Sequence, residues 1–220
     1  MRVYNRYIMR QEGELGIIGS GGQAREVAQY LSDEDSLPAF FAVHPEYLSE
    51  NDVRVNLLNP NEYERITPVV AAIGAPEVRR RLVHEWAGES FGTVIAKDAY
   101  VGETVEMGVG CIISPRAVLT ANVLLGDHVI VNIGATISHD SKIGNYATIS
   151  PGAHIAGNVE IGDGVFVGIG ATISNGIKIA EGSVIGAGAV VVNDIIENNS
   201  VVVGVPAKTI RINEGWLSEV

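Results

Sequence analysis

The sequence predicts a small α/β unit at the N-terminus followed by a parallel β-solenoid. Two observations carry this prediction: a strict six-residue repeat over residues 95–196, and a glycine-punctuated segment without that repeat before it. The repeat spans 102 residues, which is 17 hexads of six, and each hexad begins with an aliphatic residue or Met. Neither a helix of period 3.6 nor a strand of period 2 produces a period of six, so the repeat itself indicates a solenoid of short strands.

The hexads also predict the shape of one coil. Three hexads are expected to close a triangular coil of 18 residues, with the first and fifth positions pointing inward and the third and fourth at the corners. Coils would stack at about 4.8 Å, and each buries its interior only against its neighbours, so the ends need caps. We expect this core to be self-contained from Ile95 onward. Cys111, the single cysteine, occupies an inward fifth position and is expected to be a small buried residue.

The first 90 residues are expected to form a Rossmann-like α/β unit, strand–helix–strand–strand–helix in order, as domain 1–90 before a solenoid domain 91–220. A glycine turn at 19–22 separates the first strand from the first helix, and Pro76 suits the first turn of the last helix. The expected elements are strands within 16–18, 39–43 and 69–74 and helices over 23–31 and 76–86. Residues 1–14 fit an extension or a capping strand.

Composition narrows the class of partner. The net charge of −11 argues against nucleic acid and anionic membranes. No apolar run approaches 18 residues, and the first 15 residues lack the apolar core of a signal peptide. We therefore expect a cytoplasmic protein that does not insert into membranes.

Residues 18 apart should lie above one another, so the outer corners can be read as columns. The first corner is apolar and poor in side chains, with glycines such as Gly170 and Gly188 at its fourth position. Such a corner suits contact with another subunit or with a thin, flexible ligand. The third corner carries polar residues that we interpret as solvated: Asp127, Asn145, Asp163 and Glu181.

The second corner holds the best catalytic candidate. His139 should stand between Ala121 and Gly157, which leave space around its imidazole, and Asp140 follows it directly. A neutral imidazole can take a proton from an amine or hydroxyl, and a neighbouring carboxylate favours the imidazolium that results. The alternative is an ordinary polar corner, since Asp127 and His128 repeat the same residue types elsewhere.

The glycine turn GSGG at 19–22 also has two interpretations. It can present backbone N–H groups and a helix N-terminus to an anion. It can equally be a tight strand-to-helix connection. The full GxGxxG dinucleotide pattern is absent, and Val43 and His44 stand where an acidic residue would end the second strand, so NAD is not expected.

Four segments make the chain from residue 15 to 211 resemble a family: GSGGQA at 19–24, AAIG at 71–74, VNIGATISHDSKIG at 131–144 and SVVVGVPAKTIR at 200–211. They resemble bacterial hexapeptide-repeat acyltransferases of the sialic-acid O-acetyltransferase and UDP-amino-sugar N-acetyltransferase type. The resemblance implies a left-handed parallel β-helix and a homotrimer with active sites between subunits. It also implies acetyl-CoA as donor, no metal, and a nucleotide-sugar acceptor of the 4-amino-4,6-dideoxy type, in surface-glycan or glycoprotein sugar biosynthesis.

The resemblance also implies roles for individual residues. His139 would be the general base and Asp140 the acid that raises its basicity. The acceptor-site residues implied are Gly21, Gly22, Gln23, Gly74 and Asn132, and the CoA-site residues implied are Thr148, Ile169 and Ala187. The chain departs from the family pattern at Gln23, usually His, at 43–44, usually paired Asp, at Asp140, where some relatives have Glu, and at Thr148, where a relative has His.

The predicted reaction is direct transfer of an acetyl group to a neutral amine, because Cys111 is expected to be buried and no other covalent nucleophile stands out. O-acetylation of sialic acid or a related sugar is the alternative within the family. A zinc carbonic-anhydrase β-helix is disfavoured because the candidate histidines fall on different corners or heights. A non-catalytic structural solenoid is a further alternative, against which the space around His139 and the α/β unit argue.

Overall fold

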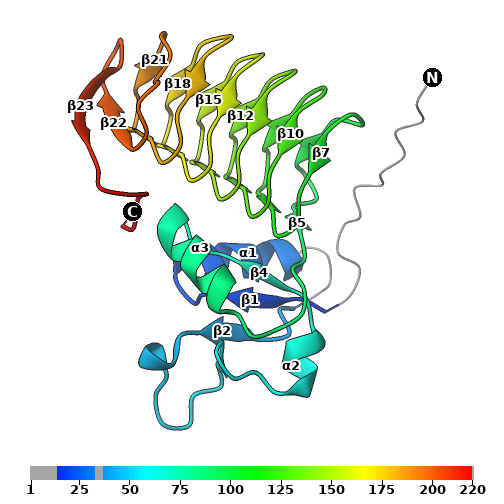
Figure 1. Ribbon diagram of the computed structural model, residues 1–220. Coiled ribbons are helices and arrows are strands. Elements are labelled where there is room, and N and C mark those ends of the chain that lie inside the picture. The colour runs from blue at the N-terminus through cyan, green and yellow to red at the C-terminus, as the bar shows by residue number, and fades with distance from the viewer. Residues whose placement is uncertain (1–13, 33–36, 220) are drawn as a thin grey trace.

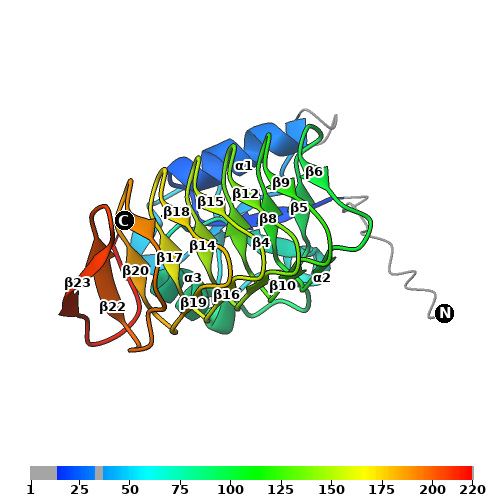
Figure 2. The same cartoon turned by 90° about the horizontal axis from the view of Figure 1, so that it is seen from above.

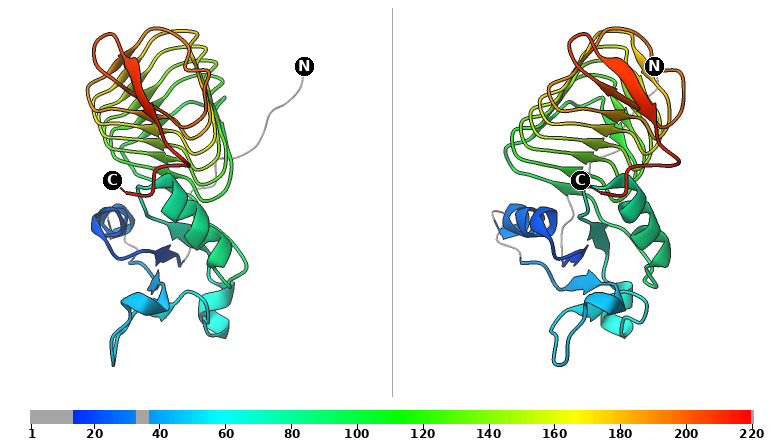
Figure 3. Two further views of the ribbon diagram at one scale, coloured as in Figure 1. Left: turned by 60° about the vertical axis from the view of Figure 1, so that its left-hand side comes forward. Right: turned by 90° about the vertical axis from the view of Figure 1, so that its left-hand side faces the viewer.

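The computed structural model describes residues 14–32 and 37–219, and it contains a small α/β unit beside a long stack of coils (Figure 1). Residues 1–13, for which we considered an extension or a capping strand, lie outside the described residues. Figure 3 shows the coils closer to end-on, with the α/β unit against one side of the stack. Among the described residues, no helix has the length and apolar character needed to cross a membrane.

The α/β unit is a four-stranded parallel sheet in the order β3-β2-β1-β4 with three helices around it. Its strands are β1 Gly16–Ile18, β2 Phe41–Val43, β3 Val55–Asn56 and β4 Val69–Ala71. Its helices are α1 Gly22–Ser32, α2 Glu62–Ile66 and α3 Pro76–Glu85, with a 3-10 turn, η1 Pro45–Tyr47. The expected strands and helices are present. β3 and α2 were not predicted, although the capping box in which the side chains of Asn61 and Glu64 bond each other's backbone N–H is a signal for α2.

The solenoid begins at β5 and consists of 17 two-residue strands, β5 to β21, one for each hexad. Its strands form three parallel sheets, which we name the docking face, the second face and the third face. The docking face contains β5 Val94–Ile95, β8 Ile112–Ile113, β11 Ile130–Val131, β14 Thr148–Ile149, β17 Phe166–Val167 and β20 Val184–Ile185. The second face contains β6 Tyr100–Val101, β9 Val118–Leu119, β12 Thr136–Ile137, β15 His154–Ile155, β18 Thr172–Ile173 and β21 Val190–Val191. The third face contains β7 Glu106–Met107, β10 Leu124–Leu125, β13 Lys142–Ile143, β16 Glu160–Ile161 and β19 Lys178–Ile179.

The pairing register confirms the predicted coil. Residues 18 apart are partners throughout, for example Leu124 with Lys142 and Thr136 with His154. The inward first and fifth positions form one continuous buried cluster through the stack. Cys111 belongs to it and is fully buried, and burial raises the pKa of its thiol to about 12, so it is protonated near neutral pH.

The C-terminal end of the stack is capped by a hairpin. Strand β22 Ser200–Val203 pairs in parallel with β20 and extends the docking face, and β23 Lys208–Ile212 pairs antiparallel with β22. The antiparallel strand cannot continue the coil, so the repeat ends there.

The α/β unit packs against the docking face through outward-pointing residues of the solenoid. Val94, Ile112 and Ile130 share a buried cluster with Ile17 and Val27 of the α/β unit. Helix α1 lies alongside the stack in Figure 2 and contacts β5. The interior of the solenoid is built from its own residues, as expected. The outer surface of the docking face also contributes to a second core, which it shares with the α/β unit.

Arg79 of α3 forms a polar joint between the two parts. Its side chain is fully buried, and its five N–H groups donate hydrogen bonds to six acceptors, so Nη2 shares one N–H between two of them. Two go to carbonyls before α3, those of Ile73 and Gly74. The other four acceptors lie on the solenoid: the carbonyls of His128, Tyr146 and Ala147 and the hydroxyl of Thr148. Burial lowers the pKa of Arg79 to about 9, so it remains charged near neutral pH.

The third corner differs from the solvated acidic column that we expected. Asp127 accepts the backbone N–H of Val109 at 2.9 Å, and Asp163 accepts that of Asn145 at 2.7 Å, so these side chains tie one coil to the next. The indole of Trp216 crosses the same corner, where an added Cβ at Gly164 would lie 2.1 Å from it. The column is therefore a hydrogen-bonded ladder with Trp216 packed beside Gly164, while Asp127 and Glu181 at its ends remain exposed as expected.

Aromatic rings continue this ladder toward the α/β unit. His128 stacks on Tyr146 with a centroid distance of 5.1 Å and meets the Phe91 ring at nearly a right angle, with a centroid distance of 4.7 Å. Tyr146 lies 6.2 Å from Trp216, over which Arg80 of α3 stands at 4.3 Å. Burial among these rings lowers the pKa of His128 to about 4.

Replacing Arg79 with Met should destabilise the protein strongly, because several buried acceptors would lose their donor. At about 1–3 kcal/mol for each orphaned buried group, we expect a loss of at least about 3 kcal/mol in the free energy of unfolding. Arg81→Met, on an exposed position of the same helix, should change it by less than about 0.5 kcal/mol. Urea denaturation of both variants checks this, and equal stabilities would contradict the joint.

The stability of the protein should fall as the pH drops from about 6.5 to about 4. Folded His128 has its pKa lowered to about 4, whereas an unfolded histidine titrates near 6.5. In this window the unfolded chain binds a proton that the folded chain does not, which costs about 3 kcal/mol when complete. Thermal melts across the window should therefore show a shallower decline for His128→Phe, which keeps a ring in the stack. Parallel declines for both proteins would refute the assignment.

Candidate active site

His139 and Asp140 lie at the second corner, between the second and third faces, as the repeat predicted. The imidazole Nδ1 lies 2.8 Å from Asp140 Oδ2. An ionised carboxylate only accepts hydrogen bonds, so Nδ1 carries the proton and Nε2 keeps a free lone pair. Both side chains are about half exposed, at 56% and 47%. An imidazole base that is half exposed can be reached by an incoming substrate.

A second residue holds Asp140 from the coil below. Asn122 donates from Nδ2 to Asp140 Oδ1 at 3.0 Å. The hydrogen bond from Asn122, and after it the one from His139, hold the pKa of Asp140 below its usual range. Asp140 is thus a carboxylate at neutral pH with both oxygens engaged.

Gly157 provides the space for the imidazole from the coil above. A Cβ built at this position would lie 2.5 Å from His139 Cε1 and 2.6 Å from Nε2. The ring therefore occupies the volume that any side chain at 157 would need. The space that we predicted around His139 is present and is filled by the ring itself.

The α/β unit lies against one side of the stack (Figure 3). The second corner does not border the docking face, so His139 lies on the side of the solenoid away from the α/β unit of its own chain. The glycine turn lies on the other side, at the start of α1. Added Cβ atoms at Gly21 and Gly22 would have no neighbour within 4 Å, so this helix N-terminus is open to a ligand. Gln23 is half-buried, and its amide nitrogen has no hydrogen-bond partner among the described residues.

Gly74 and Asn132, unlike the glycine turn, are engaged in hydrogen bonds within the protein. The carbonyl of Gly74 accepts from Thr148 Oγ1 at 2.8 Å and from Arg79, so it belongs to the polar joint. Asn132 is buried, and its backbone pairs with Ile149 and Ala135 of the solenoid. Gly74 therefore lies at the polar joint and Asn132 directly follows β11 of the docking face, whereas His139 lies at the second corner.

The first corner is exposed and apolar, as expected. Ile169 is 62% exposed, Ala187 is exposed, and Cβ atoms added at Gly170 and Gly188 would meet nothing within 4 Å. Thr148 is not part of this surface. It is 1% exposed and its hydroxyl is engaged by Gly74 and Arg79, so within this chain its side chain offers no contact to a ligand.

Arg54 lies beside the glycine turn and was missed in the sequence analysis, because no motif or spacing points to it. Its guanidinium donates to Ser20 Oγ at 3.1 Å and pairs with Asp52 at 2.5 Å. The partnership with Arg54 holds the pKa of Asp52 well below its usual range. A cation therefore stands next to the open helix N-terminus.

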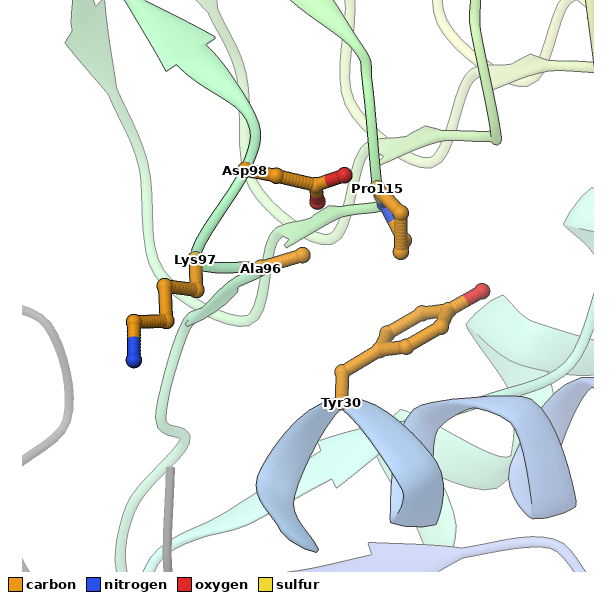
Figure 4. Close-up of a pocket in the computed structure, with 5 residues that line it drawn as sticks. All are labelled: Tyr30, Ala96, Lys97, Asp98 and Pro115. Atoms are coloured by element: carbon orange, nitrogen blue, oxygen red, sulfur yellow. The ribbon is translucent and has the colours of Figure 1, made fainter. Parts of the chain in front are cut away.

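A cavity of about 390 Å³ lies at the foot of the first corner, near the C-terminal end of α1 (Figure 4). Tyr30, Ala96, Lys97, Asp98 and Pro115 line it, with the Lys97 side chain directed away from Tyr30. None of the predicted site residues lines this cavity.

Among the described residues, no group of three or more His, Cys, Asp or Glu is placed to hold a metal ion.

Comparisons with known proteins agree with this architecture. The family model for the bacterial transferase hexapeptide (six repeats) matches residues 122–157 and 158–193. The acetyltransferase domain of PglB from Neisseria gonorrhoeae, solved with acetyl coenzyme A, is 32% identical, with a TM-score of 0.77 over 90% of this chain and 98% of that chain. The chain belongs to the hexapeptide-repeat sugar acetyltransferases.

Two further solved structures extend the comparison. PerB from Caulobacter crescentus, solved with CoA and GDP-perosamine, is 29% identical, with a TM-score of 0.82 over 90% of this chain and 97% of that chain. WeeI from Acinetobacter baumannii is 28% identical, with a TM-score of 0.77 over 90% and 100% of the two chains. A comparison with curated proteins found no match.

Replacing Gly157 with Ala should lower activity without unfolding the protein. The new methyl group would collide with Cε1 and Nε2 of His139, so the ring must rotate away from its position. A displacement of about 1 Å at a reacting group can reduce kcat by about 10²-fold. Steady-state kinetics and a thermal melt check this, with Gly215→Ala as control, because a Cβ there meets nothing within 4 Å. Full activity of Gly157→Ala would show that the position of this ring is unimportant.

Proposed function

We propose that this protein transfers the acetyl group of acetyl-CoA to the amino group of a nucleotide-linked amino-sugar, of the 4-amino-4,6-dideoxy type. The observation that carries the proposal is the His139–Asp140 pair, with both side chains about half exposed, on the solenoid of a sugar acetyltransferase. PerB, solved with GDP-perosamine and CoA, supports the choice of an amino-sugar acceptor and of N-acetylation.

In this mechanism His139 is the general base. The neutral amine attacks the thioester carbonyl while Nε2 takes its proton, and the carboxylate of Asp140 stabilises the imidazolium. A backbone N–H of the solenoid would stabilise the oxyanion. The C–S bond then breaks, and CoA leaves as the thiol with the proton from His139. A covalent route through Cys111 is disfavoured, because that thiol is buried and protonated.

The donor would lie along the first corner. Ile169 and Ala187 offer an exposed apolar strip for a thin ligand, and the glycines beside them leave the backbone accessible. Thr148, which we expected to join them, would act from inside the polar joint instead of touching CoA.

The acceptor would be held by the α/β unit, which we assign to residues 1–90 as a Rossmann-like domain, with the solenoid domain at 91–220. Gly21, Gly22 and Gln23 would receive the diphosphate at the open N-terminus of α1. Gly74 and Asn132 would support the site from the joint and the solenoid. O-acetylation of a sialic acid or related sugar is the alternative if the acceptor lacks an amine.

The proposed assembly is a homotrimer of left-handed β-helices in the cytoplasm. His139 lies away from the α/β unit of its own chain, so an acceptor bound to that unit would have to be served by the His139 of a neighbouring subunit. The exposed strip at the first corner supports a subunit contact there.

The proposal is tested by mixing the protein with acetyl-CoA and UDP-, dTDP- and GDP-linked 4-amino-sugars and measuring free thiol. His139→Ala should lower kcat by about 10²- to 10⁴-fold with little change in melting temperature. His154→Ala, an exposed histidine of the second face, serves as control and should retain activity. If no amino-sugar releases thiol and CoA does not bind, the proposed function is wrong.

A further inference from the structure

The second corner contains a chain of hydrogen bonds that extends below the catalytic pair. Thr104, Asn122 and Asp140 follow one another at intervals of 18 residues, one in each coil. Thr104 Oγ1 accepts the backbone N–H of Asn122 at 2.8 Å, and Asn122 Nδ2 donates to Asp140 Oδ1 at 3.0 Å. Asp140 Oδ2 then accepts from His139 Nδ1 at 2.8 Å. The chain ends at the imidazole.

This chain fixes a carboxylate that would otherwise be free to turn. Asp140 is about half exposed, and the terminal torsion of an aspartate is broad. One hydrogen bond to His139 would leave that rotation available, whereas two bonds, one to each oxygen, define the plane of the carboxylate. The plane of the carboxylate determines where Oδ2 accepts the hydrogen bond from Nδ1–H. The orientation of the imidazole, and with it the direction of Nε2, follows from this hydrogen bond.

We propose that Asn122 is a positioning residue for the acetyl transfer, which orients Asp140 and through it the general base His139. The inference rests on the proposed function and deepens it. Thr104 supports Asn122 by holding its backbone, and Gly157 gives the oriented ring its space. Asn122 need not touch either substrate.

The chain supplies a matched control one coil above the pair. Asn158 occupies the same corner position as Asn122, and both have a left-handed backbone with φ of +54°. Its backbone N–H donates to the carbonyl of His139, but its side chain makes no hydrogen bond to Asp140 among the described contacts. A residue substituted at 122 or at 158 must therefore adopt the same left-handed backbone. Only the substitution at 122 removes the hydrogen bond to Asp140.

The test compares Asn122→Gly and Asn122→Asp with Asn158→Gly and Asn158→Asp. Glycine accepts the left-handed backbone, and aspartate keeps the size of asparagine while losing the donor. We expect kcat to fall by about 10- to 100-fold in both Asn122 variants, with the KM values for both substrates within twofold, as for partners that orient a reacting group. The Asn158 variants should stay within about threefold of the parent.

A second readout separates positioning from a general structural effect. The ¹⁵N shifts of the two His139 ring nitrogens, measured on the folded protein, report which nitrogen carries the proton. We expect a larger fraction of the other tautomer in the Asn122 variants and no change in the Asn158 variants. Unchanged kcat and tautomer at Asn122, or equal losses at 122 and 158, would overturn the inference. His139→Ala run in parallel tests the proposed function separately, since its full activity would remove His139 from the mechanism altogether.

Discussion

The structure depends on one constraint, the stacking of each residue over the residue 18 positions away. Backbone N–H groups of one coil bond to the carbonyls of the next along all three faces, as in Thr136 N to Ala153 O at 2.9 Å. The columns that result determine which side chains meet. The His139–Asp140 pair, the side-chain amide of Asn122 below it and Gly157 above it are far apart in sequence and adjacent in space only because of this stacking.

Most of the solenoid could be predicted from the sequence, because a strict six-residue period is compatible with few backbone geometries. Every hexad gave one strand, and the first and fifth positions gave the core. The environment of His139 could also be predicted, since its neighbours in the column were known once the period was. The hydrogen bond from Asn122 to Asp140 could have been predicted in the same way, because the two residues belong to one column. We missed it because an asparagine at a corner is already explained by its left-handed backbone.

The remainder depended on contacts outside the six-residue repeat. Arg79 stands in a helix with other arginines, and its place three, four and seven residues before Leu82, Val83 and Trp86 puts it on the buried face, a signal that we did not use. Trp216 lies in a short segment after the cap and reaches the third corner by a path that the repeat does not describe. A signal for the docking face was present, because the outward position of its strands is apolar at Val94, Ile112 and Ile130. We did not separate the three faces when we considered outward positions.

The joint between the two parts explains why Thr148 differs from the expectation drawn from the resemblance. Along the docking face the outward residues are apolar up to Ile130, and Thr148 follows as a polar one. Its hydroxyl and the guanidinium of Arg79 both bond the carbonyl of Gly74, in the turn that leads into α3. Apolar packing alone would let the α/β unit slide along a smooth sheet, because dispersion and burial are not directional. Hydrogen bonds from a buried donor are directional, and leaving them unmade is costly. The polar joint therefore sets the register of the α/β unit on the solenoid, and it fixes Gly74 of the expected acceptor site directly to the scaffold that carries His139.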